Sequence, residues 1–580
     1  MDRWITDTQR WDRLPYYTRA NAGEVLPDPC SPLGWSLVFE EGLLKGWLRG
    51  FVEFGIYADG ELPTDPPPVA GLFGGYFYLN LSHMRLMGLR MGMTVEQFDA
   101  ALLGSHPDAP PYQPHPDDVD PACSAKTAAT IGEILQRTDF PEIDEDSLRV
   151  RALRRARPDL RSLGEADLVE HARSFLGELD NAFARHDYSS LASTVGQAML
   201  MQLCADAGRP DLLLDLISGL GDVESASPSS GLWDLSRTVN ASSDLRALFD
   251  QGAAAVAAAL PGATSGDRAH FRWAFDGFLS EYGMRGPNEW DIRARSWDVA
   301  PVQALAHVDR LRHSGDEGSP KVRAGRLTAR RQAAGEELRQ SLEGEKEKLR
   351  TLELALRSAK DTIPLREQTK ANAVVVVNEA RLTLGELGRR GVEAERLAEP
   401  EDVMMLLSGE LDSYVADPKA HTDVIRQRLA GYRQLFDVEP PFIIGDNLPP
   451  LRQWKRRVRE REAAAAEGTV LTGVGGSAGT YTGHARVVMT LDDAIALEPG
   501  EVMVAPLTDA AWTPLFLVAG AVVVDMGALN SHAVVVSREI GLPCVLSVTA
   551  ATSVITDGMV ITVDGTAGTV TVAAVPALAG

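Results

Sequence analysis

The chain is poor in cysteine and in positive charge. Its four cysteines, Cys30, Cys123, Cys204 and Cys544, are scattered along 580 residues and form no Cys-x-x-Cys pair. We therefore exclude a disulfide framework or cysteine-based zinc site, predict no metal, and expect reduced thiols in a cytoplasmic protein. The 57 lysines and arginines are outnumbered by 81 acidic residues, which gives a net charge of −24. Nucleic acids and anionic membranes need a basic footprint, so we expect neither as a partner.

Long apolar runs are also missing. The longest, residues 510–524, is interrupted by Thr513 and Pro514 and is too short to cross a bilayer. The first residues, MDRWITDTQRWDRLPYY, are charged and aromatic and lack the apolar core of a signal peptide. No Gly-x-x-x-x-Gly-Lys-Ser/Thr motif occurs, so the sequence has no recognisable P-loop.

The length and the local composition predict a chain of several domains. Proline and glycine dominate residues 26–75, which predicts loops and short elements there. From Thr94 onward the pattern becomes mostly helical. A long charged helix is expected over residues 321–360, and Pro364 is expected to open a second helix that pairs with it as an antiparallel hairpin.

The pattern changes after Pro450. A connector, RQWKRRVREREAAAAEG, leads into short Val/Ile/Thr-rich segments separated by Gly and Asp-Gly turns. The predicted fold class is therefore multidomain: a mostly α-helical substrate domain followed by a compact α/β domain. We expect the boundaries to be 1–450 for the helical body, 451–470 for the linker and 471–580 for the α/β domain.

One histidine of the α/β segment lies where a helix begins. Residues 521–525 form an apolar run suited to a buried strand, Ser531 is a plausible N-cap, and Gly541 can end the following helix in the left-handed conformation. His532 is then in the first turn, where unpaired N–H groups and the helix dipole favour a phosphoryl group on its ring. Neutral imidazole is a good nucleophile near neutral pH. Periodicity alone also allows a capping or core histidine.

Residues 473–570 resemble the mobile phosphohistidine domain of the phosphoenolpyruvate-utilising enzymes. The matching stretches are GVGGSAGTYTGHARVV, LEPGEVMVAPLTDAAWTPLF, AVVVDMGALNSHAVVVSREIGLPCVLSV and ITDGMVITVDGTAGTV. The resemblance implies that His532 is phosphorylated and that the domain swivels between two active sites. Ala528 and Asn530 depart from the usual motif, in which Gly and Thr are common.

The body resembles the middle domain of rifampicin phosphotransferases. Three stretches match: YYTRANAGEVLPDPCSPLGW, FLSEYGMRGPNEWDIRARSW and LREQTKANAVVVVNEARLTLGELGRRG. Met284 replaces a histidine that the second stretch usually has. The third contains Arg366-Glu367-x-x-Lys370, whose members share one turn of a helix.

The resemblance implies that this trio belongs to the acceptor site. A carboxylate such as Glu367 can take the proton of a hydroxyl while Arg366 and Lys370 stabilise the phosphoryl oxygens. A surface salt-bridge group is the alternative that helical spacing alone leaves open. We further expect four residues to bind the substrate or the phosphate: Arg19, Arg285, Ser531 and Arg538.

The family architecture also includes an ATP-grasp domain and a phosphoenolpyruvate-binding barrel, and neither is evident on the two sides of these segments. We therefore expect a dikinase-type phosphotransferase subunit that is charged from ATP and Mg²⁺ by a separate ATP-grasp subunit, as in phenylphosphate synthase-type systems of aromatic degradation. The products would be AMP, phosphate and a phosphoester of a phenol or small alcohol. Two alternatives stay open: an antibiotic phosphotransferase component, and a phosphocarrier or regulatory binding protein without acceptor chemistry.

Overall fold

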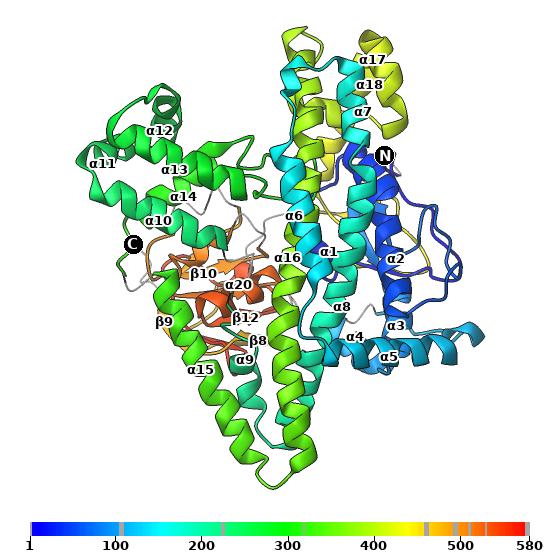
Figure 1. Cartoon of the computed structure of the whole chain (residues 1–580), viewed down its shortest axis with the longest axis vertical. Helices are drawn as coiled ribbons and strands as arrows, with labels where there is room; N and C mark the ends of the chain where they lie inside the picture. The colour runs from blue at the N-terminus through cyan, green and yellow to red at the C-terminus, as the bar shows by residue number, and fades with distance from the viewer. Residues whose placement is uncertain are drawn as a thin grey trace. The chain divides into compact units, whose positions relative to one another are not determined.

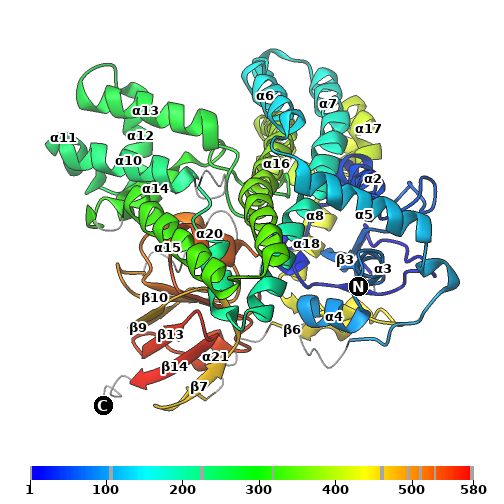
Figure 2. The ribbon, with the colours of Figure 1, turned by 60° about the horizontal axis from the view of Figure 1, so that its bottom comes forward.

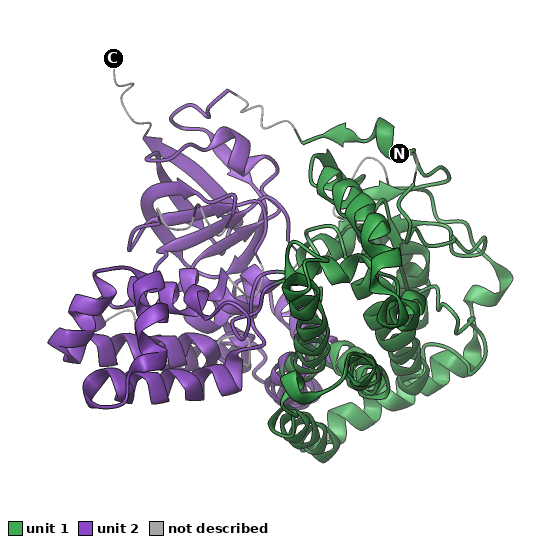
Figure 3. Cartoon of the chain, turned by 90° about the horizontal axis from the view of Figure 1, so that it is seen from above, with its two compact units in different colours: residues 1–193, 288–294, 368–458 green, residues 194–287, 295–367, 459–580 purple. Residues whose placement is uncertain are grey.

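The computed structural model describes residues 3–103, 109–221, 227–316, 319–457, 463–490, 493, 497–508, 512–527 and 531–574. The chain divides into two compact units, which Figure 3 shows in two colours. Unit 1 consists of residues 1–193, 288–294 and 368–458, and unit 2 of residues 194–287, 295–367 and 459–580. The predicted fold class is confirmed, because a mostly helical region is followed by a mixed α/β region. The compact units do not follow the expected domain boundaries, which stay a prediction.

Unit 1 is built mainly from helices (Figure 1). They are α1 (Ala22–Val25), the π-helix η1 (Gly34–Leu43), α2 (Leu44–Phe54), α3 (Leu81–Arg90), α4 (Val95–Leu103), α5 (Pro121–Gln136), α6 (Pro141–Arg155), α7 (Glu165–Arg173), most of α8 (Leu176–Asp206), the second part of α16 (Lys346–Glu393), α17 (Leu411–Ala416) and α18 (Pro418–Leu435). A small antiparallel sheet has the strand order β2 (Ala70–Phe73), β3 (Tyr76–Asn80), β1 (Tyr17–Thr18), β5 (Ile443–Ile444). Strands β4 (Val438–Glu439) and β6 (Lys455–Arg456) form a separate antiparallel pair.

The expectation of loops and short elements over residues 26–75 is wrong for its middle part. Residues 34–54 form the continuous helical run η1–α2. The glycines that suggested a loop instead allow close packing: a Cβ at Gly46 would lie 1.9 Å from the carbonyl oxygen of Asp180 on α8, and one at Gly50 would lie 2.8 Å from that of Ala184. Glycine here allows two helices to pack closely, although each glycine lowers the stability of its helix by about 1 kcal/mol relative to alanine.

Unit 2 begins with a second set of helices. These are the end of α8, α9 (Leu213–Leu216), α10 (Ser227–Ala241), α11 (Ser243–Phe249), α12 (Ala253–Ala259), α13 (Gly266–Tyr282), α14 (Pro301–Leu311), α15 (Pro320–Ser341) and the first part of α16. Apolar residues of α10 to α14, among them Leu232, Phe271 and Val308, are fully buried in one core.

The helical hairpin is present, but its turn lies elsewhere than expected. The chain reverses between α15 and α16 near Gly344, whose φ of 91° is left-handed, and Pro364 is inside α16. Proline removes one helical hydrogen bond. The turn before it, with Ala355 and Ala359, is buried against α8 and α15 residues, which explains how α16 continues. Figure 1 shows the hairpin turn at the lower end of these two helices.

The C-terminal part of unit 2 contains an eight-stranded sheet of order β7-β14-β13-β9-β10-β11-β12-β8. Its strands are β7 (Val470–Thr472), β8 (Val474–Ser477), β9 (Thr480–Val487), β10 (Val502–Ala505), β11 (Ala521–Val524), β12 (Cys544–Leu546), β13 (Val560–Asp564) and β14 (Thr569–Ala574). The strands from β9 to β12 are parallel and the others are antiparallel. Figure 2 shows β7, β13 and β14 together at one part of this sheet.

The central strands are buried on both faces, as is usual for parallel strands. Alternate residues of β10 and β11 enter two different cores: Met503 and Val522 pack in the core that includes α20 (His532–Ile540), and Val504 and Val523 in the core next to α21 (Ala551–Val554).

Two further observations concern the cysteines and the apolar segments of the chain. All four cysteines are free and buried. Among the described residues, no helix is long and apolar enough to span a membrane.

Candidate active site

His532 is the first residue of α20, at the carboxyl end of the parallel strand β11. Ser531 is the N-cap, as predicted, with an extended backbone. The helix ends at Gly541, whose φ of 76° is left-handed, and Pro543 then leads into β12. The strand, cap, helix and stop therefore occur as the sequence predicted. Ala528 and Asn530, the two departures from the family motif, lie outside the described residues.

Each ring nitrogen of His532 lies within hydrogen-bonding distance of a threonine hydroxyl. Nδ1 lies 2.9 Å from Oγ1 of Thr508, and Nε2 lies 2.9 Å from Oγ1 of Thr513. Both threonines are 2% exposed. The ring of Phe516 meets the imidazole edge-on at 5.7 Å between centroids. These three contacts come from the loop after β10 and from α19 (Thr513–Phe516), and together they fix the ring plane.

The threonines also constrain the proton on the imidazole. A neutral ring donates from one nitrogen and accepts at the other, whereas a hydroxyl can do either. One threonine therefore accepts from the N–H while the other donates to the lone pair, which is the nucleophilic position. The N–H groups and dipole of the first turn of α20 add positive potential, which favours a phosphoryl group on this ring.

Thr508 and Thr513 were missed by the sequence prediction. Both lie in LTDAAWTPLF, a stretch that carries the family resemblance, but 19 to 24 residues separate them from His532. No local pattern marks a threonine as a partner of a distant ring. Only the pairing of β10 with β11 brings their segments together.

Ser531 and Arg538 flank His532 differently. Ser531 is 3% exposed, and its side chain makes no capping hydrogen bond. Arg538 is six residues along α20, a rise of about 9 Å. Its Nε donates to the carbonyl of Gly476 at 2.8 Å, and burial lowers the pKa of this guanidinium to about 10. This position favours a packing role for Arg538, and its contact with a phosphate stays a prediction.

The predicted acceptor trio lies on α16. Arg366 and Glu367 are hydrogen-bonded to each other, and the Glu367 side chain is only 4% exposed. Lys370 Nζ lies 3.6 Å from a carboxylate oxygen of Glu289, which is also buried. The boundary between the units falls within the helix after Glu367, so Lys370 belongs to unit 1. The buried carboxylate does not fit an exposed surface salt bridge, and the acceptor role stays a prediction.

The two remaining arginines are also buried. Arg19 donates to the carbonyls of Phe77 at 2.7 Å and Leu26 at 3.1 Å, and burial lowers the pKa of its guanidinium. These contacts tie β1 to its surroundings inside unit 1. Arg285 is 2% exposed and lies in unit 2, where its carbonyl accepts from the Trp297 N–H. Their roles in substrate binding stay predictions.

Comparison with known proteins matches two families to two segments of the chain. The rifampicin phosphotransferase fourth domain matches residues 186–367, and the mobile domain of PEP-utilising enzymes matches residues 497–568. The second match contains His532 with both of its threonine partners. This chain carries a mobile domain of the PEP-utilising enzymes. The fourth-domain match includes Arg366 and ends at Glu367.

Relatives support the same assignment. An uncharacterised protein of Mycobacterium tuberculosis (strain ATCC 25618 / H37Rv) is 36% identical over 292 residues, which cover 50% of this chain and 30% of the relative. The rifampicin phosphotransferase of Bacillus subtilis (strain 168) is 31% identical over 50% of this chain and 33% of its own length. The prodigiosin synthesizing transferase PigC of Serratia marcescens is 29% identical over 59% and 38%. The chain is thus a distant homologue of rifampicin phosphotransferases, and it spans about a third of the length of these relatives.

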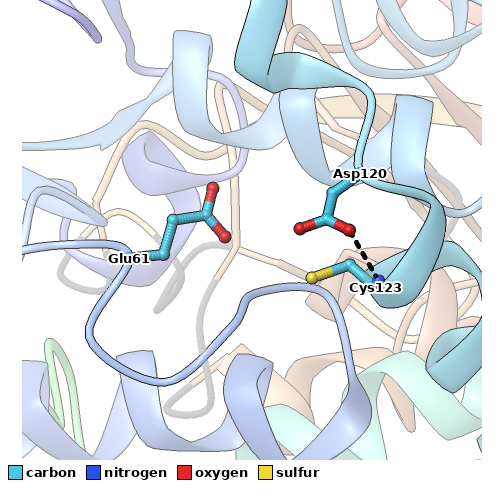
Figure 4. A group of neighbouring side chains, drawn as sticks. All are labelled: Glu61, Asp120 and Cys123. Carbon is cyan, nitrogen blue, oxygen red and sulfur yellow. Dashed lines mark hydrogen bonds between the residues drawn. The ribbon is translucent and has the colours of Figure 1, made fainter.

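One further group of polar side chains has the composition of a metal site. Oxygens of Glu61 and Asp120 and the sulfur of Cys123 lie within 4.8 Å of one another (Figure 4). Hydrogen bonds already account for this arrangement. Both Glu61 oxygens accept from Arg90 at 2.8 Å, and Asp120 caps α5 by accepting from the N–H groups of Ala122 and Cys123. We therefore assign no metal to it.

Proposed function

We propose that this protein is a phosphotransferase in which His532 receives a phosphoryl group derived from ATP and passes it to an organic hydroxyl. The observation that carries the proposal is the imidazole at the start of α20, held at both nitrogens by Thr508 and Thr513 inside a matched mobile domain. A ring fixed in this way presents one lone pair in a defined direction. Phosphorylation displaces the threonine at that nitrogen, whose hydroxyl then lies beside the phosphoryl oxygens.

The acceptor step is assigned to the α16 trio. Glu367 takes the proton of the hydroxyl, whose oxygen attacks phosphorus as the P–N bond to His532 breaks. Arg366 and Lys370 stabilise the charge on the phosphoryl oxygens. The burial of Glu367 and its contact with Arg366 support this assignment, since both keep a carboxylate in a fixed direction. A pure phosphocarrier has no need for such a group.

We propose the acceptor as a chemical class, an organic compound with a hydroxyl group. A phenol or small alcohol follows from the resemblance to phenylphosphate synthase-type systems. An antibiotic hydroxyl is the second candidate, and it is favoured by a specific observation: curated relatives from Bacillus and Streptomyces bear the name rifampicin phosphotransferase. Both candidates share the chemistry of a hydroxyl that attacks phosphohistidine.

The source of the phosphoryl group is proposed to be ATP with Mg²⁺, bound on a separate ATP-grasp subunit. The match to a phosphohistidine-type mobile domain and the similarity to rifampicin phosphotransferases support a dependence on ATP. The relatives are about three times longer than the segment they share with this chain, so an equivalent nucleotide site on the same polypeptide is the competing arrangement. The overall reaction consumes ATP, water and the hydroxyl compound and yields AMP, phosphate and the phosphoester.

Labelling with γ- and β-³²P-ATP in the presence of the partner tests the carrier. We expect acid-labile, base-stable phosphate on the wild-type protein, and none on His532→Ala. His484→Ala is the matched control, because His484 is exposed on β9 and its Nδ1 lies 3.3 Å from the carbonyl oxygen of Gly558, away from His532 in the sequence. Label that persists in His532→Ala would refute the carrier role. ADP as the sole nucleotide product would refute the dikinase stoichiometry.

A further inference from the structure

An open pocket of about 670 Å³ lies within unit 2, between α15 and the edge of the eight-stranded sheet (Figure 2). This volume is in the range of small-molecule sites. One wall comes from α15, and the other from the segments that lead into the parallel strands β9 to β12, namely residues 478–481, 499–500, 517–520 and 540–543. The pocket is therefore at the amino ends of these strands. His532 lies at the carboxyl end of β11, so the pocket and the phosphohistidine site are at opposite edges of the sheet.

The wall from α15 gives the pocket a positive charge. Three arginines line it, Arg323, Arg326 and Arg330, and their spacing of three and four residues places them on one face of the helix. No carboxylate is among the described lining residues, although the chain as a whole carries a net charge of −24. A concave surface lined by charges of one sign concentrates ions of the opposite sign. The pocket is therefore suited to an anion.

The three arginines differ in their contacts within the protein. Arg330 pairs with Asp215 at 2.7 Å, and Arg323 donates to the carbonyl of Leu517 at 3.3 Å. The exposed guanidinium of Arg326, between them on the helix, makes no ion pair or hydrogen bond with a described residue. Its fork of donors can bind the oxygens of a ligand. We expect Arg326 to supply the main ionic contact.

A buried hydroxyl adds a second polar group. Ser314 lines the same pocket, and its Oγ is buried with no hydrogen-bond partner among the residues that the structure describes. A buried polar atom that lacks a partner costs free energy, and a ligand oxygen that enters the pocket supplies one. Ser314 and Arg326 together offer donors to more than one ligand oxygen.

The wall from the sheet is mostly apolar. Besides glycine, alanine and proline, it contains the ring of Tyr481 and the aliphatic side chains of Leu517, Val518, Ile540 and Leu542. The tyrosine ring is held in place, because its hydroxyl donates to the carbonyl of Gly500 at 2.7 Å and a Cβ at Gly520 would overlap the ring. A flat ring beside aliphatic side chains favours a ligand with an apolar or aromatic body.

We propose that this pocket, called here the α15 pocket, binds an organic phosphate monoester with an apolar or aromatic body. A phosphate group is favoured over a carboxylate because it has three terminal oxygens and a charge of about −1.5 to −2 near pH 7, which suits several guanidinium groups and a hydroxyl. The body of the ligand lies against Tyr481 and the aliphatic side chains. The phosphoester product of the proposed phosphotransferase belongs to this class, but the site stands whether or not that reaction occurs.

Calorimetric titration of the full chain with phenyl phosphate tests the site. We expect a saturable binding event that Arg326→Ala weakens at least about tenfold, through loss of charge-assisted hydrogen bonds, and that Arg326→Glu abolishes. Arg350→Ala is the matched control and should leave binding unchanged, because Arg350 is an exposed arginine on α16 that does not line the pocket. Since Arg326 is exposed, its variants should melt at the wild-type temperature. No binding to the wild type, or equal binding to Arg326→Glu, would overturn the proposal.

A series of ligands tests the chemical class. Phenyl phosphate should bind more tightly than inorganic phosphate, which lacks the apolar body, and more tightly than benzoate, which has a carboxylate instead. Phenol, which has no charge, should not bind. Inorganic phosphate that binds as tightly as phenyl phosphate would refute the role of the apolar wall. Benzoate that binds as tightly would refute the choice of a phosphate group.

His532→Ala separates the α15 pocket from the phosphohistidine site. The binding event that depends on Arg326 should have the same affinity in His532→Ala as in the wild type. Its loss in that variant would place the ligand at the phosphohistidine site and overturn the proposal. The titration needs neither nucleotide nor a partner subunit. A chain in which His532 is never labelled can still bind phenyl phosphate, and a labelled chain can fail to bind it, so the two proposals fail separately.

Discussion

The two halves of the proposed reaction are built in opposite ways. The phosphohistidine site is local: a nine-residue helix, its cap and one neighbouring loop hold His532 within a single sheet domain. The acceptor trio lies on the 48-residue helix α16, whose two parts belong to different compact units. A local site can be carried from place to place as one body. In the proposed reaction, the phosphoryl group on His532 is passed to the hydroxyl at this trio.

The largest effect is expected when the proposed general base of the acceptor site, Glu367, is removed. Glu367→Gln should slow transfer to the hydroxyl by about a hundredfold or more, because a positioned general base contributes that much. Phosphorylation of His532 should be almost unchanged. Single-turnover transfer from pre-phosphorylated protein measures the first effect and ATP labelling the second. A phenol, which is more acidic than an aliphatic alcohol, should suffer the smaller loss.

Two further variants complete that test. Lys370→Ala should also impair transfer, since it removes positive charge from the phosphoryl oxygens. Glu347→Gln is the matched control, because Glu347 is an exposed glutamate on the same helix. Unchanged transfer in a folded Glu367→Gln variant would leave the Arg366–Glu367 pair as a purely structural ion pair and the acceptor site unlocated.

The same contrast explains what could be predicted from sequence. The strand before His532, the Ser531 cap and the Gly541 stop each have a signature of one or two residues, and the structure contains all three. The Thr508 and Thr513 contacts have none, because strand pairing creates them. In the body, glycine was taken as a loop signal where it permits helix contact at Gly46, and Pro364 as a helix start where buried neighbours sustain the helix. In both places, packing against neighbouring helices outweighs the low intrinsic helix propensity of glycine and proline.

The smallest expected effect concerns the threonines that hold the imidazole. Valine has the shape of threonine but no hydroxyl, so Thr508→Val and Thr513→Val each remove one hydrogen bond, worth about 1 kcal/mol, and should slow phosphorylation of His532 about fivefold. Thr482→Val is the control, because its hydroxyl bonds that of Thr562 on the exposed part of the sheet. If the two threonines served packing alone, their replacement would lower the stability of the protein without changing the tautomer or orientation of the His532 ring. If the threonines position the imidazole, loss of either hydroxyl allows both tautomers of the neutral ring to be populated. The ¹⁵N shifts of His532 should then move toward an average of the two tautomers, and the pH profile of phosphorylation should shift. Unaltered ¹⁵N shifts in both variants would show that groups other than these two hydroxyls orient the ring.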